Sequence, residues 1–282
     1  MSFASVEHLL DAAAAMPLWQ AVQTDDCQDR GVKPEVSFAK MSGLWSAMKR
    51  SSAEYDPVLR SASGLTGGDG GKMESAGNTL CGPFLQSVIT TALKVGECNA
   101  CMRRIVAAPT AGASGVMPAV LIPLQEKEGY SDEAMTWALY TAAGFGQVIA
   151  ARASISGAEG GCQAEIGSAS AMAAAALVSL RGGTPAQMAA ACATALQNLM
   201  GLVCDPVGGL VELPCIKRNV IGAVNALSCA DLALAGILNP IPCDEVIDAM
   251  GAVGRALPSS LRETGQGGLA ATPTARKISE KL

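Results

Sequence analysis

Apolar residues recur at helical spacing along most of this 282-residue chain, and this feature constrains the fold most strongly. One such series consists of Phe38, Met41, Leu44, Trp45 and Met48. It predicts an amphipathic helix from Ser37 to about Arg50, and a second series predicts a more buried helix over residues 80–93. Because no run of strictly alternating apolar and polar residues occurs, we expect no strands and an all-α fold.

Capping signals locate the starts of later helices. Ser131 can cap a helix that has an acidic first turn. Thr184 combines a capping hydroxyl with a following proline and with Gln187 three residues later, and its helix should end near Gly201. A further helix is expected from about Asp244 to the residues before the proline at 258.

The composition indicates a tightly packed interior of small side chains. Half of the residues are hydrophobic but only 4% are aromatic, so alanine and glycine must fill much of the core. We expect a single compact helical domain over residues 1–282, with Gly-rich functional loops and with residues 1–60 as a possible N-terminal subregion. The net charge of −5 argues against a nucleic-acid partner.

No segment is expected to enter a membrane or direct secretion. Glu7, His8 and Asp11 interrupt the N-terminal region where a signal peptide needs an apolar run. The uncharged stretch 105–124 is long enough to span a bilayer, but three prolines and two glycines interrupt it. We therefore expect a cytoplasmic protein.

Ten cysteines suggest metal ligands or free thiols, because they are scattered singly rather than in a dense disulfide pattern. Cys98 and Cys101 form a C-x-x-C pair, but they lie in a predicted helix with no preceding strand, so we interpret them as packing residues. Cys162, Cys204 and Cys215 instead lie in predicted loops. Thiolates from separate loops can converge on a cluster, although spacing alone leaves lone structural thiols as the alternative.

Longer motifs around these cysteines resemble the α subunit of bacterial iron–sulfur L-serine dehydratases. The motifs are SGLTGGDGGK, RRIVAAPTAGASG, ISGAEGGCQAEIGSAS, LVCDPVGGLVELPCIKRN and LPSSLRETGQGGLAATPT. The resemblance runs from about Phe38 to Pro273 and implies that Cys162, Cys204 and Cys215 hold a [4Fe–4S] cluster. It also implies β-elimination of water from L-serine, giving pyruvate and ammonia, by an oxygen-sensitive enzyme.

Two departures from the family pattern occur. Ala113-Ser114-Gly115 stands where the family usually has Ser-Cys-Gly, but that cysteine is not an implied ligand. Some single-chain relatives carry a C-terminal cysteine that reaches the cluster, and residues 278–282 provide none. With three cysteine ligands, one iron stays open to act as a Lewis acid.

Polar residues of the Gly-rich loops are the candidates for substrate binding. They are Ser63, Thr66, Gly67, Gly68, Asp69, Thr110, Ser114, Glu165, Lys217 and Arg262. The general base stays unassigned, because the one histidine, His8, is interpreted as a surface residue. The resemblance implies a β subunit with a Ser-Ser-His-Thr motif, and we expect it to complete the site in an oligomer.

Three alternatives stay open at this point. The same chemistry could act on L-threonine or L-cysteine. A non-catalytic or electron-transfer iron–sulfur module would require a fourth cysteine ligand, for which Cys192 and Cys229 are the nearest candidates in sequence. A pyridoxal phosphate enzyme is disfavoured, because no lysine lies in a recognisable cofactor-binding context.

Overall fold

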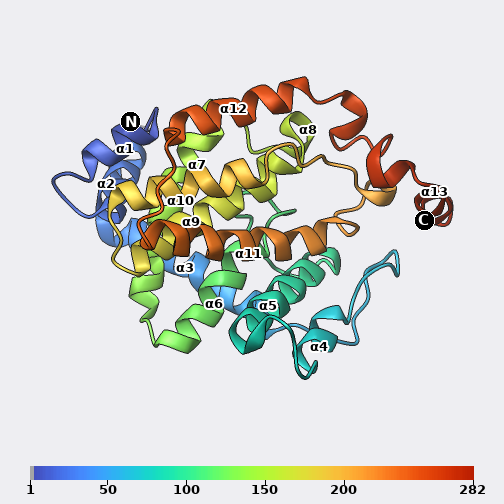
Figure 1. The fold of residues 1–282 in the computed structure, drawn as a ribbon. Helices are drawn as coiled ribbons and strands as arrows, with labels where there is room; N and C mark the ends of the chain where they lie inside the picture. The colour runs from blue at the N-terminus through green and yellow to red at the C-terminus, as the bar shows by residue number, and fades with distance from the viewer. Residues whose placement is uncertain (1–2) are drawn as a thin grey trace.

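The computed structural model describes residues 3–282 and, within them, contains helices but no β-strand (Figure 1). The all-α prediction is therefore confirmed. The first helices are α1 (Val6–Ala12), α2 (Leu18–Arg30), α3 (Pro34–Ala53), α4 (Asp69–Glu74), α5 (Gly82–Ala100), α6 (Val116–Glu128) and α7 (Asp132–Arg152). The others are α8 (Gly157–Gly160), α9 (Ser168–Leu180), α10 (Pro185–Asn198), α11 (Cys215–Leu234), α12 (Cys243–Ala256) and α13 (Pro273–Ser279). A π-helix, Gln163–Gly167, precedes α9.

The predicted starts of α7 and α10 agree with the structure. The Ser131 hydroxyl accepts a hydrogen bond from the Ala134 N–H at the start of α7. At the start of α10, Thr184 and Gln187 form both hydrogen bonds of a capping box. Local side-chain chemistry therefore determines where these helices begin. Helix α3 starts three residues before the predicted Ser37, because Pro34 suits a first helical position.

Helix α9 lies at the centre of the core. Its residues Ala169, Ala171 and Ala173 to Ala176 are fully buried, and α7, α10 and α11 pack against it (Figure 1). Small side chains allow these helices to approach closely. A Cβ at Gly222 of α11 would lie 2.9 Å from the Ile166 side chain, so this contact has no room for a larger residue. Between residues 3 and 282, each helix is too short or too polar to cross a membrane.

Removal of the α10 cap is expected to destabilise the chain modestly. Thr184→Ala deletes the acceptor for the Gln187 N–H and should lower the free energy of unfolding by about 1 kcal/mol. Urea denaturation of the metal-free chain measures this change. Thr184→Ser keeps the hydroxyl and should match the parent, so an equal loss in both variants would contradict the capping role.

Candidate metal centre

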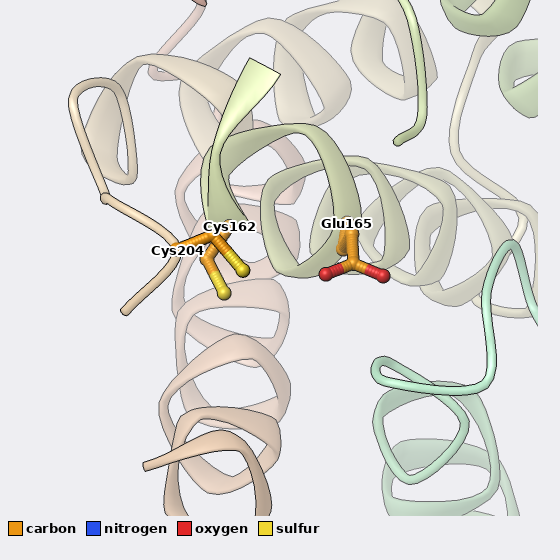
Figure 2. Close-up of side chains that lie close together, drawn as sticks. All are labelled: Cys162, Glu165 and Cys204. Atoms are coloured by element: carbon orange, nitrogen blue, oxygen red, sulfur yellow. The ribbon is translucent and has the colours of Figure 1, made fainter. Parts of the chain in front are cut away.

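Two cysteines and a glutamate form a group that could hold a metal. The sulfur atoms of Cys162 and Cys204 and a carboxylate oxygen of Glu165 all lie within 4.8 Å of one another. Cys162 immediately precedes the π-helix that carries Glu165, and Cys204 follows the end of α10. Figure 2 shows the two sulfurs side by side, with the Glu165 carboxylate on the same side of the helical segment. π-Helical turns occur frequently at functional sites.

Cys215 lies at the edge of this group. It is buried, and its pKa is raised to about 12 by burial and by the nearby charges of Cys162 and Glu165. Cys215 is the first residue of α11, so the prediction that it lies in a loop is wrong. Pro214 immediately precedes this helix, at a position where the missing N–H of proline costs no helical hydrogen bond. Cys204 does lie in a loop, as predicted.

Arg218 supplies positive charge to the cysteines. Its Nη1 donates to the Cys162 sulfur at 3.5 Å and to the Val203 carbonyl at 2.8 Å, while Nη2 lies 2.8 Å from Asp205 Oδ1. The hydrogen bond from Cys204 and the charge of Arg218 lower the pKa of the Cys162 thiol, although burial opposes them. The pKa of Cys204 is raised, because its thiol donates to Cys162 and is buried. Of these two hydrogen-bonded thiols, Cys162 is therefore the one whose pKa is lowered.

Lys217, which we selected from sequence as a candidate substrate contact, is exposed, whereas Arg218 is half-buried and contacts Cys162. Residues three apart on a helix share a face, which places Arg218 beside Cys215, whereas Lys217 is turned away.

The loop at residues 108–115 contacts Glu165 through Thr110. The Thr110 hydroxyl donates to Glu165 Oε1 at 2.6 Å. Burial raises the pKa of the Glu165 carboxyl, as does the charge of Glu263, while the Thr110 hydrogen bond lowers it. A Cβ at Gly157 would lie 2.7 Å from Glu165 Oε2, so only glycine leaves room for this carboxylate. The Ser114 hydroxyl is buried and has no hydrogen-bond partner among residues 3–282.

Asn219 joins this loop to the start of α11. Its Oδ1 accepts from the Gly115 N–H at 2.9 Å. Its Nδ2 donates to the Gly112 carbonyl at 2.8 Å and to the Cys215 carbonyl at 3.0 Å. Asn219 is buried, and its bonds to the Gly115 N–H and to the Cys215 carbonyl are shielded from water. The loop is therefore fixed relative to Cys215.

The first half of the Ser61–Asp69 loop is tied to a residue that sequence reasoning missed. The hydroxyls of Ser61 and Ser63 donate to the carboxylate of Glu212, with oxygen–oxygen distances of 2.8–2.9 Å. Ser63 is thus already engaged within the chain. The Thr66 hydroxyl is buried and, in the described part of the chain, has no hydrogen-bond partner.

The second half of the same loop is tied to Glu97 of α5. Its carboxylate accepts from the N–H groups of Asp69 at 2.8 Å and Gly70 at 3.2 Å. These two N–H groups are therefore occupied and are not free to bind a substrate anion. Asp69 itself is paired with Lys72. The preceding Gly67 and Gly68 have φ values of +131° and +83°, which only glycine adopts readily.

Arg262 lies in a segment that is bonded to Cys204 through the main chain. The Cys204 N–H donates to the Leu261 carbonyl, and the Glu263 N–H donates to the Cys204 carbonyl, both at 2.9 Å. The half-buried Arg262 lines a cavity of about 380 Å³ beside Gly160 and Gln163. The segment therefore holds the backbone of Cys204 in place from outside the helical core.

The remaining cysteines are separate from this group. Cys192 and Cys229, the candidates for a fourth ligand, are fully buried in the core on α10 and α11, and Cys192 lies beside Cys243. Cys98 is buried and donates to the Ser51 carbonyl, as its interpretation as a packing residue requires. Neither Cys98 nor the core cysteines Cys192 and Cys229 belong to the group formed by Cys162, Glu165 and Cys204.

Arg218, Asn219, Glu212 and Glu97 were not among the residues selected from sequence as candidate substrate contacts. The sequence does indicate the first two, because Arg218 follows Cys215 closely enough for its charge to offset a cluster there, and positions 215, 218 and 219 share a helix face. Glu212 and Glu97 meet their partners across 149–151 and 27–28 residues, and no local pattern reports such pairs.

Comparison with known proteins places this chain in a family. The model of the family described as "Serine dehydratase alpha chain" matches residues 13–270. A Bacillus subtilis protein named "Probable L-serine dehydratase, alpha chain" is 52% identical over 248 residues, covering 87% of this chain and 83% of that protein. The "L-serine dehydratase, alpha chain" of Peptoniphilus asaccharolyticus is 50% identical over 204 residues, covering 72% and 70%. A Mycobacterium tuberculosis "L-serine dehydratase" is 46% identical over 184 residues, covering 64% of this chain but only 40% of that protein.

Proposed function

This chain belongs to the serine dehydratase alpha chain family, and we propose that it is the subunit of an iron–sulfur enzyme that eliminates water from L-serine. Elimination across Cα and Cβ gives aminoacrylate, which tautomerises and hydrolyses to pyruvate and ammonia. The observation that carries this proposal is the buried convergence of Cys162, Cys204 and Glu165, with Cys215 beside them.

The residues present fit an iron–sulfur cluster. Thiolates are the ligands of such clusters. The thiols of Cys162 and Cys204 lie together here, and Cys215 is near enough for the charge of Cys162 to raise its pKa. The set carries excess negative charge when it is deprotonated, and Arg218 offsets part of it. A [4Fe–4S] cluster held by three cysteines has one iron without a protein thiolate, and this iron supplies Lewis-acid chemistry at the site.

The chain's own side chains bind and orient the substrate in this proposal. The buried hydroxyls of Thr66 and Ser114 need hydrogen-bond partners, and a substrate carboxylate supplies acceptors for them. Glu165, which Thr110 holds in place, can bind the substrate ammonium or hold a proton at Oε2. Because Cys162 and Cys204 are buried, the enclosed site keeps bulk water away from the reacting atoms.

L-Serine is the proposed substrate because each of the named relatives reported above is a serine enzyme. L-Threonine adds a methyl group at Cβ, and L-cysteine replaces the leaving hydroxyl with a thiol. Electron transfer is disfavoured, because Cys192 and Cys229 are enclosed in the helical core rather than placed beside Cys162.

A second chain is expected to supply the general base. His8, the one histidine, is exposed on α1, at the end of the molecule opposite the start of α11 (Figure 1). The match to the Mycobacterium tuberculosis enzyme covers only 40% of its length, so that single chain contains further sequence. The relatives named "alpha chain" imply a separate β chain. We propose that the β chain carries the Ser-Ser-His-Thr motif and completes the site.

Anaerobic reconstitution with iron and sulfide, followed by a pyruvate assay, tests this function. With L-serine, addition of the β chain is expected to raise kcat by about 10²–10⁴-fold, the usual contribution of a general acid–base group. The matched control is the β chain with its motif histidine changed to alanine. Full turnover by this chain alone would overturn the partner's role, and no pyruvate from the complex would overturn the function.

A further inference from the structure

Glu212 is a buried residue three positions before Cys215, and its carboxylate is bonded to the Gly-rich loop. It is 6% exposed, and hydroxyls from Ser61 and Ser63 donate to both of its carboxylate oxygens. Those hydroxyls in turn accept from the loop's own backbone, Ser63 from the Leu65 N–H at 3.1 Å and Ser61 from the Thr66 N–H at 3.4 Å. The carboxylate therefore orders the loop from within.

The same residue is joined rigidly to α11. The Glu212 carbonyl accepts from the Ile216 N–H at 3.1 Å, in the first turn of the helix that begins at Cys215. Ile216 also packs against Gly96 of α5, where an added Cβ would lie 3.1 Å from its side chain. On α5, the neighbouring Glu97 accepts hydrogen bonds from the N–H groups at the other end of the loop. Figure 1 shows the loop before α4 and the start of α11 at the same end of the molecule.

We propose that Glu212 is a positioning residue, which fixes the Ser61–Thr66 segment relative to Cys215 so that Thr66 is presented to the substrate. This inference rests on the proposed function. Glu212 acts through Ser61 and Ser63 and does not itself touch substrate. Both carboxylate oxygens accept hydrogen bonds, and one of them, Oε2, accepts from both serines. A glutamine whose oxygen takes the place of Oε2 keeps these two bonds without the charge, whereas alanine keeps none of them.

Backbone exchange in the reconstituted chain tests the positioning directly. In Glu212→Ala, the buried Ser61 hydroxyl loses its acceptor, and amide hydrogen exchange at Leu65 and Thr66 should accelerate by about tenfold or more. Ser63→Ala should accelerate the same amides, and the double variant should add little, because both changes break one network. Ser87→Ala, on the exposed face of α5, is the control and should leave loop exchange unchanged.

Kinetics of the complex with the β chain provide the second readout. The iron content of Glu212→Ala should equal that of the parent, while KM for L-serine rises by about tenfold, and Glu212→Gln should fall between the two. Unchanged loop exchange, or loss of iron without a change in loop exchange, would overturn the proposal. If the parent complex makes no pyruvate, the proposed function fails, and amide exchange still decides whether Glu212 orders the loop.

Discussion

Alanine substitution of Cys204 is expected to abolish L-serine deamination and to lower the iron bound after anaerobic reconstitution. Cys204 contributes one sulfur of the buried group with Cys162 and Glu165. Without it, the remaining thiols cannot hold the cluster. Lewis-acid stabilisation is worth several kcal/mol, and each 1.36 kcal/mol changes a rate tenfold, so kcat should fall by about 10³-fold or more. Iron analysis, absorbance and the pyruvate assay measure these losses.

Cys192→Ala is the matched control for this experiment. Cys192 is as buried as Cys204 but lies in the core on α10, next to Cys243. The control should retain iron and activity while losing some stability, because a small cavity replaces its sulfur. Equal iron in the two variants would contradict the assignment of Cys204 as a ligand.

Loss of the Arg218 side chain is expected to have the second largest effect. Arg218 forms an ion pair with Asp205, whose side chain is 3% exposed, and donates to the Cys162 sulfur. Arg218→Ala leaves a buried carboxylate uncompensated, which typically costs about 3–5 kcal/mol. The variant should unfold at a lower urea concentration. It should also bind less iron, because the Arg218 charge that helps to lower the pKa of the Cys162 thiol is gone.

Neighbouring residues provide the controls for Arg218. Lys217→Ala removes an exposed cation and should change the free energy of unfolding by less than about 0.5 kcal/mol. Asp205→Asn combined with Arg218→Ala removes the unpaired charge and should recover part of the stability but not the iron. The ion-pair account is wrong if Lys217→Ala and Arg218→Ala behave alike.

The helices were predictable because local interactions determine them. The capping box at Thr184 and the cap at Ser131 depend on residues within three positions, and both occur as the sequence indicated. The structure brings Cys162 and Cys204 together with Glu165, while the place of Cys215 as a third ligand stays a prediction. The hydrogen bond between Cys204 and Cys162 depends on tertiary contacts and did not follow from spacing.

The substrate loop illustrates what local patterns miss. Its glycines and hydroxyls suggested open hydrogen-bond donors, yet Glu97 and Glu212 occupy most of them. Both glutamates lie far along the chain from the loop's first serine, Glu97 on α5 and Glu212 in the bend before α11. Neither can be told from a surface glutamate until the fold encloses it. Thr66 keeps an unpaired buried hydroxyl, and its contact with substrate stays a prediction.

Mössbauer spectroscopy of the complex reconstituted with ⁵⁷Fe tests the central claim most directly, because it distinguishes an iron with three cluster sulfides and a cysteine from one open to substrate. The account predicts a [4Fe–4S] cluster in which L-serine changes the isomer shift and quadrupole splitting of one iron and leaves the other three as they were. Four irons that are indifferent to L-serine would contradict a three-cysteine site with an open iron.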